Sequence, residues 1–318
     1  MNDLAIDATG LSKSYAGTRV LDGVDLRVPA GSVFALLGPN GAGKTTAVRI
    51  LATLTPPDRG TARVAGFDVV RQRSQVRKRI SLTGQYAALD ELQTGEENLQ
   101  MMGRLLRLSS GTARARAADL LEKFDLVDAA RRRVGTYSGG MRRRLDLAAS
   151  LVGGPDVIFL DEPTTGLDPR SRQAMWMVVT DLAASGVTIF LTTQYLDEAD
   201  HVADRIAVLD SGHVVAEGTA PELKRQVGGP RLELTLAGEW AFDQVSGQLG
   251  ERAIGADRAG LRVAVATDGS AAHVRTTLDT LDPDHRSITH FDVHDATLDD
   301  VFMTLTGHHS SQKETADV

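Results

Sequence analysis

Hydrophobic residues follow two different patterns along this chain. Long apolar runs occupy residues 32–37, 157–160 and 187–193. Such runs are typical of strands that are buried on both faces of a parallel sheet. Further along, residues 231–236, 261–265 and 287–293 show the apolar and polar alternation of other strands. The pattern therefore predicts two regions that contain different kinds of sheet.

The remaining segments place helices and a boundary between these regions. Residues 85–151 are charged with a helical periodicity and are expected to form a helical subdomain. Gly228-Gly229-Pro230 interrupts regular structure and separates a first domain, 1–227, from a second, 230–307. In the second domain we expect helices at 240–249 and 271–281 and a closing helix that ends near Gly307. The result is a small α+β domain of ferredoxin-like type without a catalytic cluster, followed by a polar, disordered tail at 308–318.

Composition narrows the class of protein. The chain has 318 residues, of which 42% are hydrophobic and 24% charged, as in an ordinary globular protein. No apolar stretch approaches the roughly 18 residues that span a bilayer, and the first residues lack a signal-peptide pattern. The absence of cysteine excludes disulfides and thiol catalysis and fits a reducing cytosol. A net charge of −7 argues against nucleic acid as a partner.

A phosphate-binding loop lies between the first apolar run and a helical pattern that starts at residue 46. The nine residues of this loop are Gly38, Pro39, Asn40, Gly41, Ala42, Gly43, Lys44, Thr45 and Thr46. The glycines let the backbone N–H groups turn inward toward an anion, at the positive end of the following helix. In such a loop Lys44 binds the β- and γ-phosphates and the Thr45 hydroxyl is a ligand for Mg²⁺. The sequence therefore predicts a site for a nucleoside triphosphate.

Polar residues follow the two other apolar runs. Asp161 and Glu162 come directly after residues 157–160, and Gln194 comes directly after residues 187–193. Because open α/β sheets bind ligands at the carboxyl ends of their strands, we expect these side chains and Lys44 to share one edge of the sheet. Asp161 is then placed to hold Mg²⁺, and Glu162 to act as the general base that polarises the attacking water. The alternative is that both carboxylates only form a turn before Pro163.

A second anion-binding element precedes the Asp161 strand. Ser138-Gly139-Gly140 opens a helical pattern and offers free N–H groups, a hydroxyl and the positive end of a helix dipole. Taken alone it could be a simple helix cap. One subunit needs only one phosphate-binding element to bind one triphosphate, and this chain has two.

In combination these motifs resemble the ATP-binding subunit of an ABC transporter, over about residues 4–223. The resemblance implies an α/β P-loop NTPase fold with a parallel sheet core, a β arm and a helical subdomain. It also implies a head-to-tail homodimer in which each ATP is held between the P-loop of one copy and Ser138 of the other. Asp168 would link the two sites across this interface, and Gln85 would sense Mg²⁺ and water. Tyr15 matches the aromatic residue that stacks on adenine, although it is nearly as well explained as a tyrosine packed in a strand.

Two residues depart from the family pattern. Gln194 replaces the usual histidine that contacts the γ-phosphate; an amide can donate a hydrogen bond but cannot carry a charge. We therefore expect nucleotide binding to survive and turnover to be modest. Met141 replaces the usual glutamine after Ser138-Gly139-Gly140 and removes a polar contact there.

The segments around Ser138 and Gln194, together with Leu298-Asp299-Asp300-Val301-Phe302 near the chain end, resemble the daunorubicin/doxorubicin-resistance type of exporter subunit. The resemblance implies an ATPase at the cytoplasmic face of the membrane that powers efflux of a hydrophobic drug or secondary metabolite through a separate integral membrane permease. Two other readings stay open: an exporter of lipid or polysaccharide, and a low-turnover regulatory or drug-sequestering protein. A soluble ATPase of ribosomes or chromosomes would carry tandem cassettes or a long coiled coil, and the sequence has neither.

Overall fold

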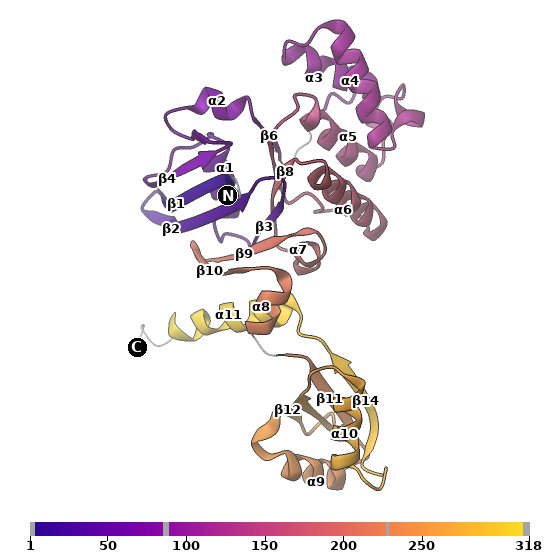
Figure 1. Cartoon of the computed structure of the whole chain (residues 1–318). Coiled ribbons are helices and arrows are strands. Elements are labelled where there is room, and N and C mark those ends of the chain that lie inside the picture. The colour runs from indigo at the N-terminus through magenta and orange to yellow at the C-terminus, as the bar shows by residue number, and fades with distance from the viewer. Residues whose placement is uncertain (1–3, 85–88, 227–228, 314–318) are drawn as a thin grey trace. The chain divides into compact units, whose positions relative to one another are not determined.

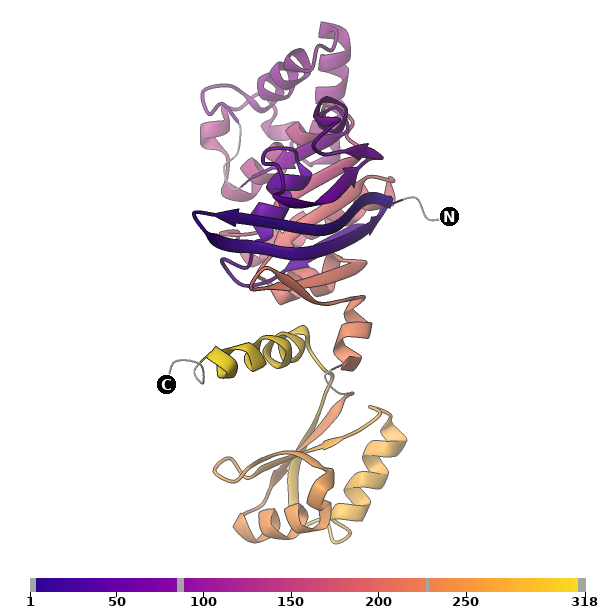
Figure 2. The same cartoon turned by 90° about the vertical axis from the view of Figure 1, so that its left-hand side faces the viewer.

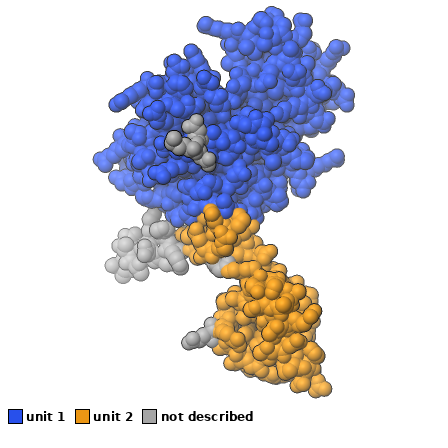
Figure 3. Space-filling view, in the orientation of Figure 1, with its two compact units in different colours: residues 1–220 blue, residues 221–318 orange. Residues whose placement is uncertain are grey.

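A computed structural model describes residues 4–84, 89–226 and 229–313. It contains two compact units, Met1–Ala220 and Pro221–Val318, each of which is treated by itself (Figure 3). The division falls at Pro221, slightly before the glycine-rich segment at which we expected it.

A six-stranded sheet forms the centre of the first unit, in the order β10-β9-β3-β8-β7-β6 (Figure 1). Its strands are β3 (Val33–Leu37), β6 (Ile80–Thr83), β7 (Val157–Asp161), β8 (Thr188–Thr193), β9 (Arg205–Asp210) and β10 (His213–Gly218). All neighbouring pairs are parallel except β9 and β10. β3, β7 and β8 are buried along their whole length, as their apolar runs predict.

A second, antiparallel sheet of order β2-β1-β4-β5 forms the arm of this unit. Its strands are β1 (Leu4–Tyr15), β2 (Thr18–Pro29), β4 (Arg59–Val64) and β5 (Phe67–Asp68). The long strands β1 and β2 face the viewer in Figure 2.

The core of the first unit joins the two sheets through helix α1 (Lys44–Leu51). Ile50 and Leu51 of this helix belong to one buried cluster with residues of β1 and β2 from the arm and of β3, β7 and β8 from the central sheet. Phe34 and Phe159 lie at the register positions of Phe190 on either side of it, with ring centroids 5.6 and 5.7 Å from its ring. These aromatic contacts support the register of β3, β8 and β7. The residues of the candidate site lie at the ends of these three strands.

The other helices of this unit are α2 (Arg73–Arg77), α3 (Gly95–Leu105), α4 (Ser110–Lys123), α5 (Gly139–Leu151), α6 (Pro169–Ala184) and α7 (Leu196–Val202), with single 3₁₀ turns at Val127–Ala129 and Val134–Thr136. α3, α4 and α5 form the predicted helical subdomain. Ser138 and Asp168 begin α5 and α6 as N-caps: their side chains accept hydrogen bonds from Met141 N and Ser171 N. Figure 1 shows α6 and α7 on the side of the central sheet away from α1.

The second unit has the element order and strand order of a ferredoxin-like domain, as expected from the sequence. After α8 (Ala220–Gln226) come β11 (Arg231–Leu236), α9 (Glu239–Leu249), a 3₁₀ turn (Gly250–Arg252), β12 (Ala253–Asp257), β13 (Arg262–Ala266), α10 (Ala271–Leu281), β14 (Ile288–His294) and α11 (Leu298–Lys313). The sheet is antiparallel, in the order β12-β13-β11-β14. Leu232 and Leu234 pack with Phe242 of α9 and Val274 of α10, so one face of the sheet carries the core.

Two details of this unit differ from the expectation. β12 was not predicted, because Ala253-Ile254-Gly255-Ala256 is short and only its first residue is even half buried. The closing helix α11 continues through Lys313 instead of ending near Gly307, so the expectation of a disordered tail at 308–318 is wrong for residues 308–313, while 314–318 lie outside the described residues. Polar residues do not by themselves end a helix. Within the described residues, no helix is long and apolar enough to cross a membrane.

Candidate nucleotide-binding site

The P-loop connects β3 to α1, in the strand–loop–helix setting that its sequence predicts. A Cβ at Gly38 would collide with the carbonyl oxygen of Leu209, and Gly43 has a φ of +110° with Val20 O only 2.7 Å from the position of a Cβ. Both positions therefore require glycine, for close approach and for backbone conformation. The carbonyl of Ala42 accepts from Gly212 N at 3.1 Å, so the loop is fixed against the end of β9. Asn40 and Gly41 are exposed at its tip, and Thr46 is half buried in the first turn of α1.

Lys44 is the buried cation of the site, with a relative exposure of 5%. Its Nζ donates to the carbonyls of Gly38 and Pro39 at 2.7 and 3.1 Å and lies 3.8 Å from Oε1 of Glu162. Burial lowers the pKa of Lys44, while the nearby carboxylates of Glu162 and Asp161 act in the opposite direction. An ammonium held mainly by neutral carbonyls is suited to bind the oxygens of a phosphate group.

Asp161 lies at the end of β7 beside Thr45. The Thr45 hydroxyl is 3.2 Å from Oδ2 of Asp161, and the Thr192 hydroxyl donates to its Oδ1 at 2.5 Å. A hydroxyl and a carboxylate are hard oxygen ligands, and Mg²⁺ in triphosphate sites takes one or two protein oxygens and completes its shell with phosphate and water. The oxygens of Thr45 and Asp161 are therefore of the kind that binds Mg²⁺, the cation that the sequence analysis assigns to them.

Glu162 has an unusual backbone conformation for its position. Its φ is +50°, in the left-handed region, and its N–H donates to both the carbonyl and the hydroxyl of Thr192. Its side chain is 12% exposed and is bonded only weakly, by the Thr165 hydroxyl at 3.3 Å. The neighbouring strand β8 thus holds the residue in a strained conformation, which is a feature of functional sites. A carboxylate so placed, beside Lys44, is suited to accept a proton from water.

Ser138 and Asp168 lie at the starts of two helices that approach each other closely. A Cβ at Gly140 would lie 2.6 Å from Oγ of Ser171, and this same Oγ donates to Oδ2 of Asp168 at 2.7 Å. Hydrogen bonds from the Ser171 side chain and backbone hold the pKa of Asp168 below its usual range. The Ser138 element and Asp168 are therefore neighbours.

The remaining expected residues lie around these clusters. Gly38 N donates to Thr193 O at 3.2 Å, so the half-buried Gln194 directly follows a residue that is bonded to the P-loop. Tyr15 ends β1, pairs with Thr18 and is 43% exposed, with Nζ of Lys13 5.5 Å from its ring centroid. An exposed ring is available for stacking on a planar ligand. Gln85 falls outside the described residues.

Sequence reasoning missed two residues that this geometry makes important. Thr192 is hydrogen-bonded to both Asp161 and Glu162. In the sequence, this role is indicated only by the position of Thr192 near the end of β8, the strand that pairs with β7. Arg143 donates to the carbonyls of Pro163 and Gly84 from within α5, and no sequence signal distinguishes it from the arginines on either side of it. Both contacts join segments that are far apart in the sequence.

A parallel sheet with a P-loop, Thr45 and Asp161 for a cation, and Glu162 beside Lys44 defines a P-loop nucleoside triphosphatase. Comparison with known proteins specifies the class further. The family model described as ABC transporter matches residues 21–165. The chain is 51% identical to the daunorubicin/doxorubicin resistance ATP-binding protein DrrA of Streptomyces peucetius, over 98% of this chain and 95% of that protein.

Two further similarities agree with this. The chain is 44% identical to the Nod factor export ATP-binding protein I of Ralstonia nicotianae, over 69% of this chain and 68% of that protein. A solved structure titled as the ATP binding subunit of an ABC transporter is 29% identical and has a TM-score of 0.62, covering 70% of this chain and 92% of its own. The chain belongs to the ABC transporter family, as an ATP-hydrolysing, ATP-binding subunit.

Proposed function

We propose that two copies of this chain pair head to tail and hold two ATP molecules, each between the P-loop of one copy and Ser138-Gly139-Gly140 of the other. The observation that supports this most is the presence of two anion-binding helix starts in one unit. One is the P-loop before α1, and the other is the exposed Ser138 cap of the thirteen-residue helix α5. Because one triphosphate needs only one of them in a single copy, the second is free to bind a nucleotide of a partner.

In this scheme each residue of the site has one role. Lys44 and the P-loop amides bind the β- and γ-phosphates, and Gln194 donates to the γ-phosphate. Thr45 and Asp161 hold Mg²⁺, with Gln85 as a further ligand, and the ion neutralises charge on the phosphates when bound. Glu162 takes a proton from the attacking water, Tyr15 stacks on adenine and Asp168 connects the two sites.

The cargo and the place of action follow from the relatives. The S. peucetius protein is named for daunorubicin and doxorubicin resistance and the R. nicotianae protein for Nod factor export. The first of these matches nearly the whole chain, including the second unit. We therefore infer that this subunit acts at the cytoplasmic face of the membrane and powers efflux of a hydrophobic drug or secondary metabolite through a separate permease.

The nucleotide sandwich is tested with a charge at the tip of α5. Gly139 has open space where a Cβ would project, so Gly139→Asp and Gly139→Ala both fit the fold. In a Glu162→Gln background, which slows hydrolysis, we expect ATP to produce a dimer in size-exclusion chromatography. Gly139→Ala keeps this dimer, whereas Gly139→Asp leaves a monomer that still binds ATP, because a carboxylate repels the partner's γ-phosphate. An ATP-induced dimer of the Gly139→Asp protein would contradict the sandwich.

Transport is tested with the membrane partner. Vesicles that contain the chain co-purified with its permease should accumulate daunorubicin when ATP and Mg²⁺ are present, and the Lys44→Ala complex should not. Uptake of a lipid-linked saccharide in place of the drug would overturn the cargo assignment and leave the ATPase assignment intact.

A further inference from the structure

A largely buried arginine on α5 contacts both segments that follow the strands β6 and β7. The Nε of Arg143 donates to the carbonyl of Pro163 at 2.9 Å, and its Nη1 donates to the carbonyl of Gly84 at 2.8 Å. Pro163 directly follows Glu162, and Gly84 directly precedes Gln85. The same α5 begins at Ser138, five residues earlier by number. One guanidinium therefore connects three segments that the proposed function uses.

The guanidinium of Arg143 is largely buried and incompletely hydrogen-bonded. Its side chain is 12% exposed, and its nearest carboxylate is that of Asp146, 3.6 Å away and one turn further along α5. Burial lowers the pKa of Arg143, while the charges of Asp146, Glu198 and Asp161 raise it. Among the described residues, its buried Nη2 has no hydrogen-bond partner. A largely buried cation that is incompletely bonded costs stability.

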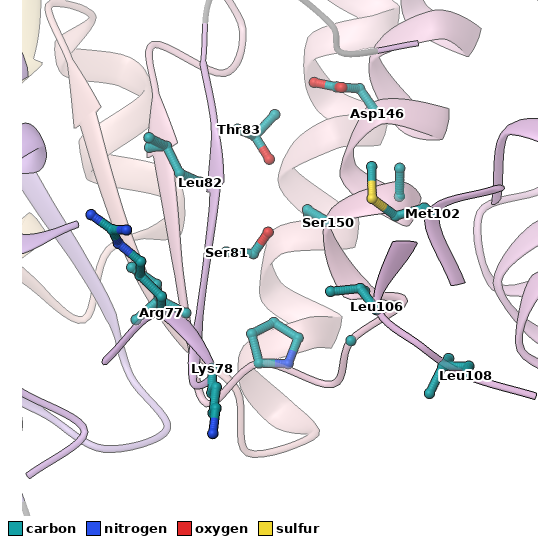
Figure 4. Close-up of a pocket in the computed structure, with 14 residues that line it drawn as sticks. Arg77, Lys78, Ser81, Leu82, Thr83, Met102, Leu106, Leu108, Asp146 and Ser150 are labelled. Carbon is teal, nitrogen blue, oxygen red and sulfur yellow. The ribbon is translucent and has the colours of Figure 1, made fainter. Parts of the chain in front are cut away.

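A cavity lies between β6 and the part of α5 that follows Arg143. This cavity of about 380 Å³ separates β6 from α5 over much of their length. Figure 4 shows Ser81 and Thr83 on the β6 side of this cavity and Asp146 and Ser150 on the α5 side. A cavity of this size leaves fewer side-chain contacts between the strand and the helix than a close-packed interior would have. Just beyond the end of β6 the guanidinium bonds directly to the carbonyl of Gly84.

We propose that Arg143 is a positioning residue: it couples the position of the Ser138 helix to the alignment of Glu162 and to Gly84 at the end of β6. The proposal rests on the proposed function, since it requires Ser138 to engage nucleotide. When α5 is drawn toward the γ-phosphate of the partner site, the planar guanidinium pulls on the carbonyls of Gly84 and Pro163 together. Lysine cannot replace this arrangement, because its ammonium is a single point on a flexible stem and does not present two fixed, separated donors.

The test compares Arg143→Gln with Arg144→Gln in the full chain. Arg144 is the next residue of the same helix, and its Nη1 donates to the carbonyl of Phe124 and pairs with Asp125, within the helical subdomain. We expect Arg143→Gln to bind a fluorescent ATP analogue within about twofold of the parent affinity, because the P-loop is untouched. Its kcat should fall about 10- to 100-fold, as expected for small misplacements of catalytic groups. Arg144→Gln should retain the parent kcat.

Arg143→Lys keeps the buried charge and should have a kcat between those of the parent and Arg143→Gln. If Arg143→Gln does not fold, Arg143→Lys decides the matter, and a parent-like kcat would overturn the proposal. Equal losses in the Arg143→Gln and Arg144→Gln proteins, or a loss of ATP affinity that matches the loss of kcat, would also overturn it. A Glu162→Gln protein that forms no ATP-induced dimer refutes the proposed sandwich instead, so the two failures are distinguishable.

Discussion

The two units build their sheets from opposite strand arrangements, and only one of them gathers catalytic groups. In the first unit β3, β7 and β8 are parallel and buried on both faces, so their carboxyl ends meet at one edge. In the second unit the antiparallel strands end alternately at opposite edges. Its charged residues pair across neighbouring strands instead, as Arg262 does with Glu233 and Asp257. Strand direction therefore decides whether side chains distant in sequence converge on a ligand.

The described residues of the second unit form no alternative site of this kind. Where the structure describes residues, no group of three or more His, Asp or Glu side chains is placed to hold a metal ion. His290 pairs with Asp292 on β14, 3.1 Å away, on exposed side chains. The comparison therefore predicts that changes in the first unit act on catalysis and that changes in the second act on its own stability.

The largest effect is expected from Glu162. Glu162→Gln keeps the shape of the side chain but removes the proton acceptor, so kcat should fall by about 10²- to 10⁴-fold, the range for loss of a general base. Phosphate release at saturating ATP measures this. Arg262→Ala in the second unit is the control and should hydrolyse ATP at the parent rate; an equal loss there would break the distinction between the units.

Next in size is the effect of the aromatic core on stability. Phe190→Ala removes the ring between Phe34 and Phe159, and truncation of a buried phenylalanine costs about 3–5 kcal/mol. Calorimetry of the full chain should show a lower melting temperature for the first unit alone. ATP should raise the same transition, because a ligand stabilises the unit that binds it. A shift of both transitions by either change would show that the units unfold together.

Thr192 should have a smaller effect, on the cation. Thr192→Val keeps the shape of a fully buried side chain but removes the hydroxyl that donates to Asp161. We expect the Mg²⁺ concentration for half-maximal hydrolysis to rise about 10-fold, within the range for loss of a group that orients a metal ligand. Thr188→Val, on the same strand but bonded to Gly31 N, should leave the Mg²⁺ requirement unchanged.

The smallest effect belongs to the second unit and depends on pH. Burial alone would raise the pKa of Asp282, but the N–H groups of Ile288, Arg286 and Ser287 outweigh it and hold the pKa below its usual value. A carboxyl with a lower pKa in the folded state stabilises the fold above the unfolded pKa of about 4, and this contribution is lost as the pH falls through the folded pKa.

Asp282→Ala should therefore destabilise the second unit by about 1–2 kcal/mol at pH 7. The difference from the parent should shrink toward pH 3, while ATP hydrolysis at pH 7 stays unchanged. Melting curves of the second transition across this pH range measure it. A difference that is the same at every pH would show that Asp282 acts without its charge.

Local patterns predicted most of the secondary structure and the ligand chemistry, because both depend on residues close in sequence. The apolar runs of β3, β7 and β8 and the P-loop spacing needed no tertiary information. β12 was missed because its exposed, edge position leaves little pattern to detect. The boundary expected at Gly228-Gly229-Pro230 differs from the division of the structure at Pro221. Glycine and proline mark where regular structure is interrupted, whereas the division between the units depends on which residues pack together.

By itself, the sequence determined where the phosphate-binding loop lies and which polar residues follow the apolar runs, since glycine spacing and these polar residues are local features. Tertiary structure alone decided that Thr192 holds both Asp161 and Glu162, and that Arg143 reaches Gly84 and Pro163. These contacts join residues about 20 to 60 positions apart. At such separations the distance between two residues depends on strand order and helix packing, and local propensity does not determine it.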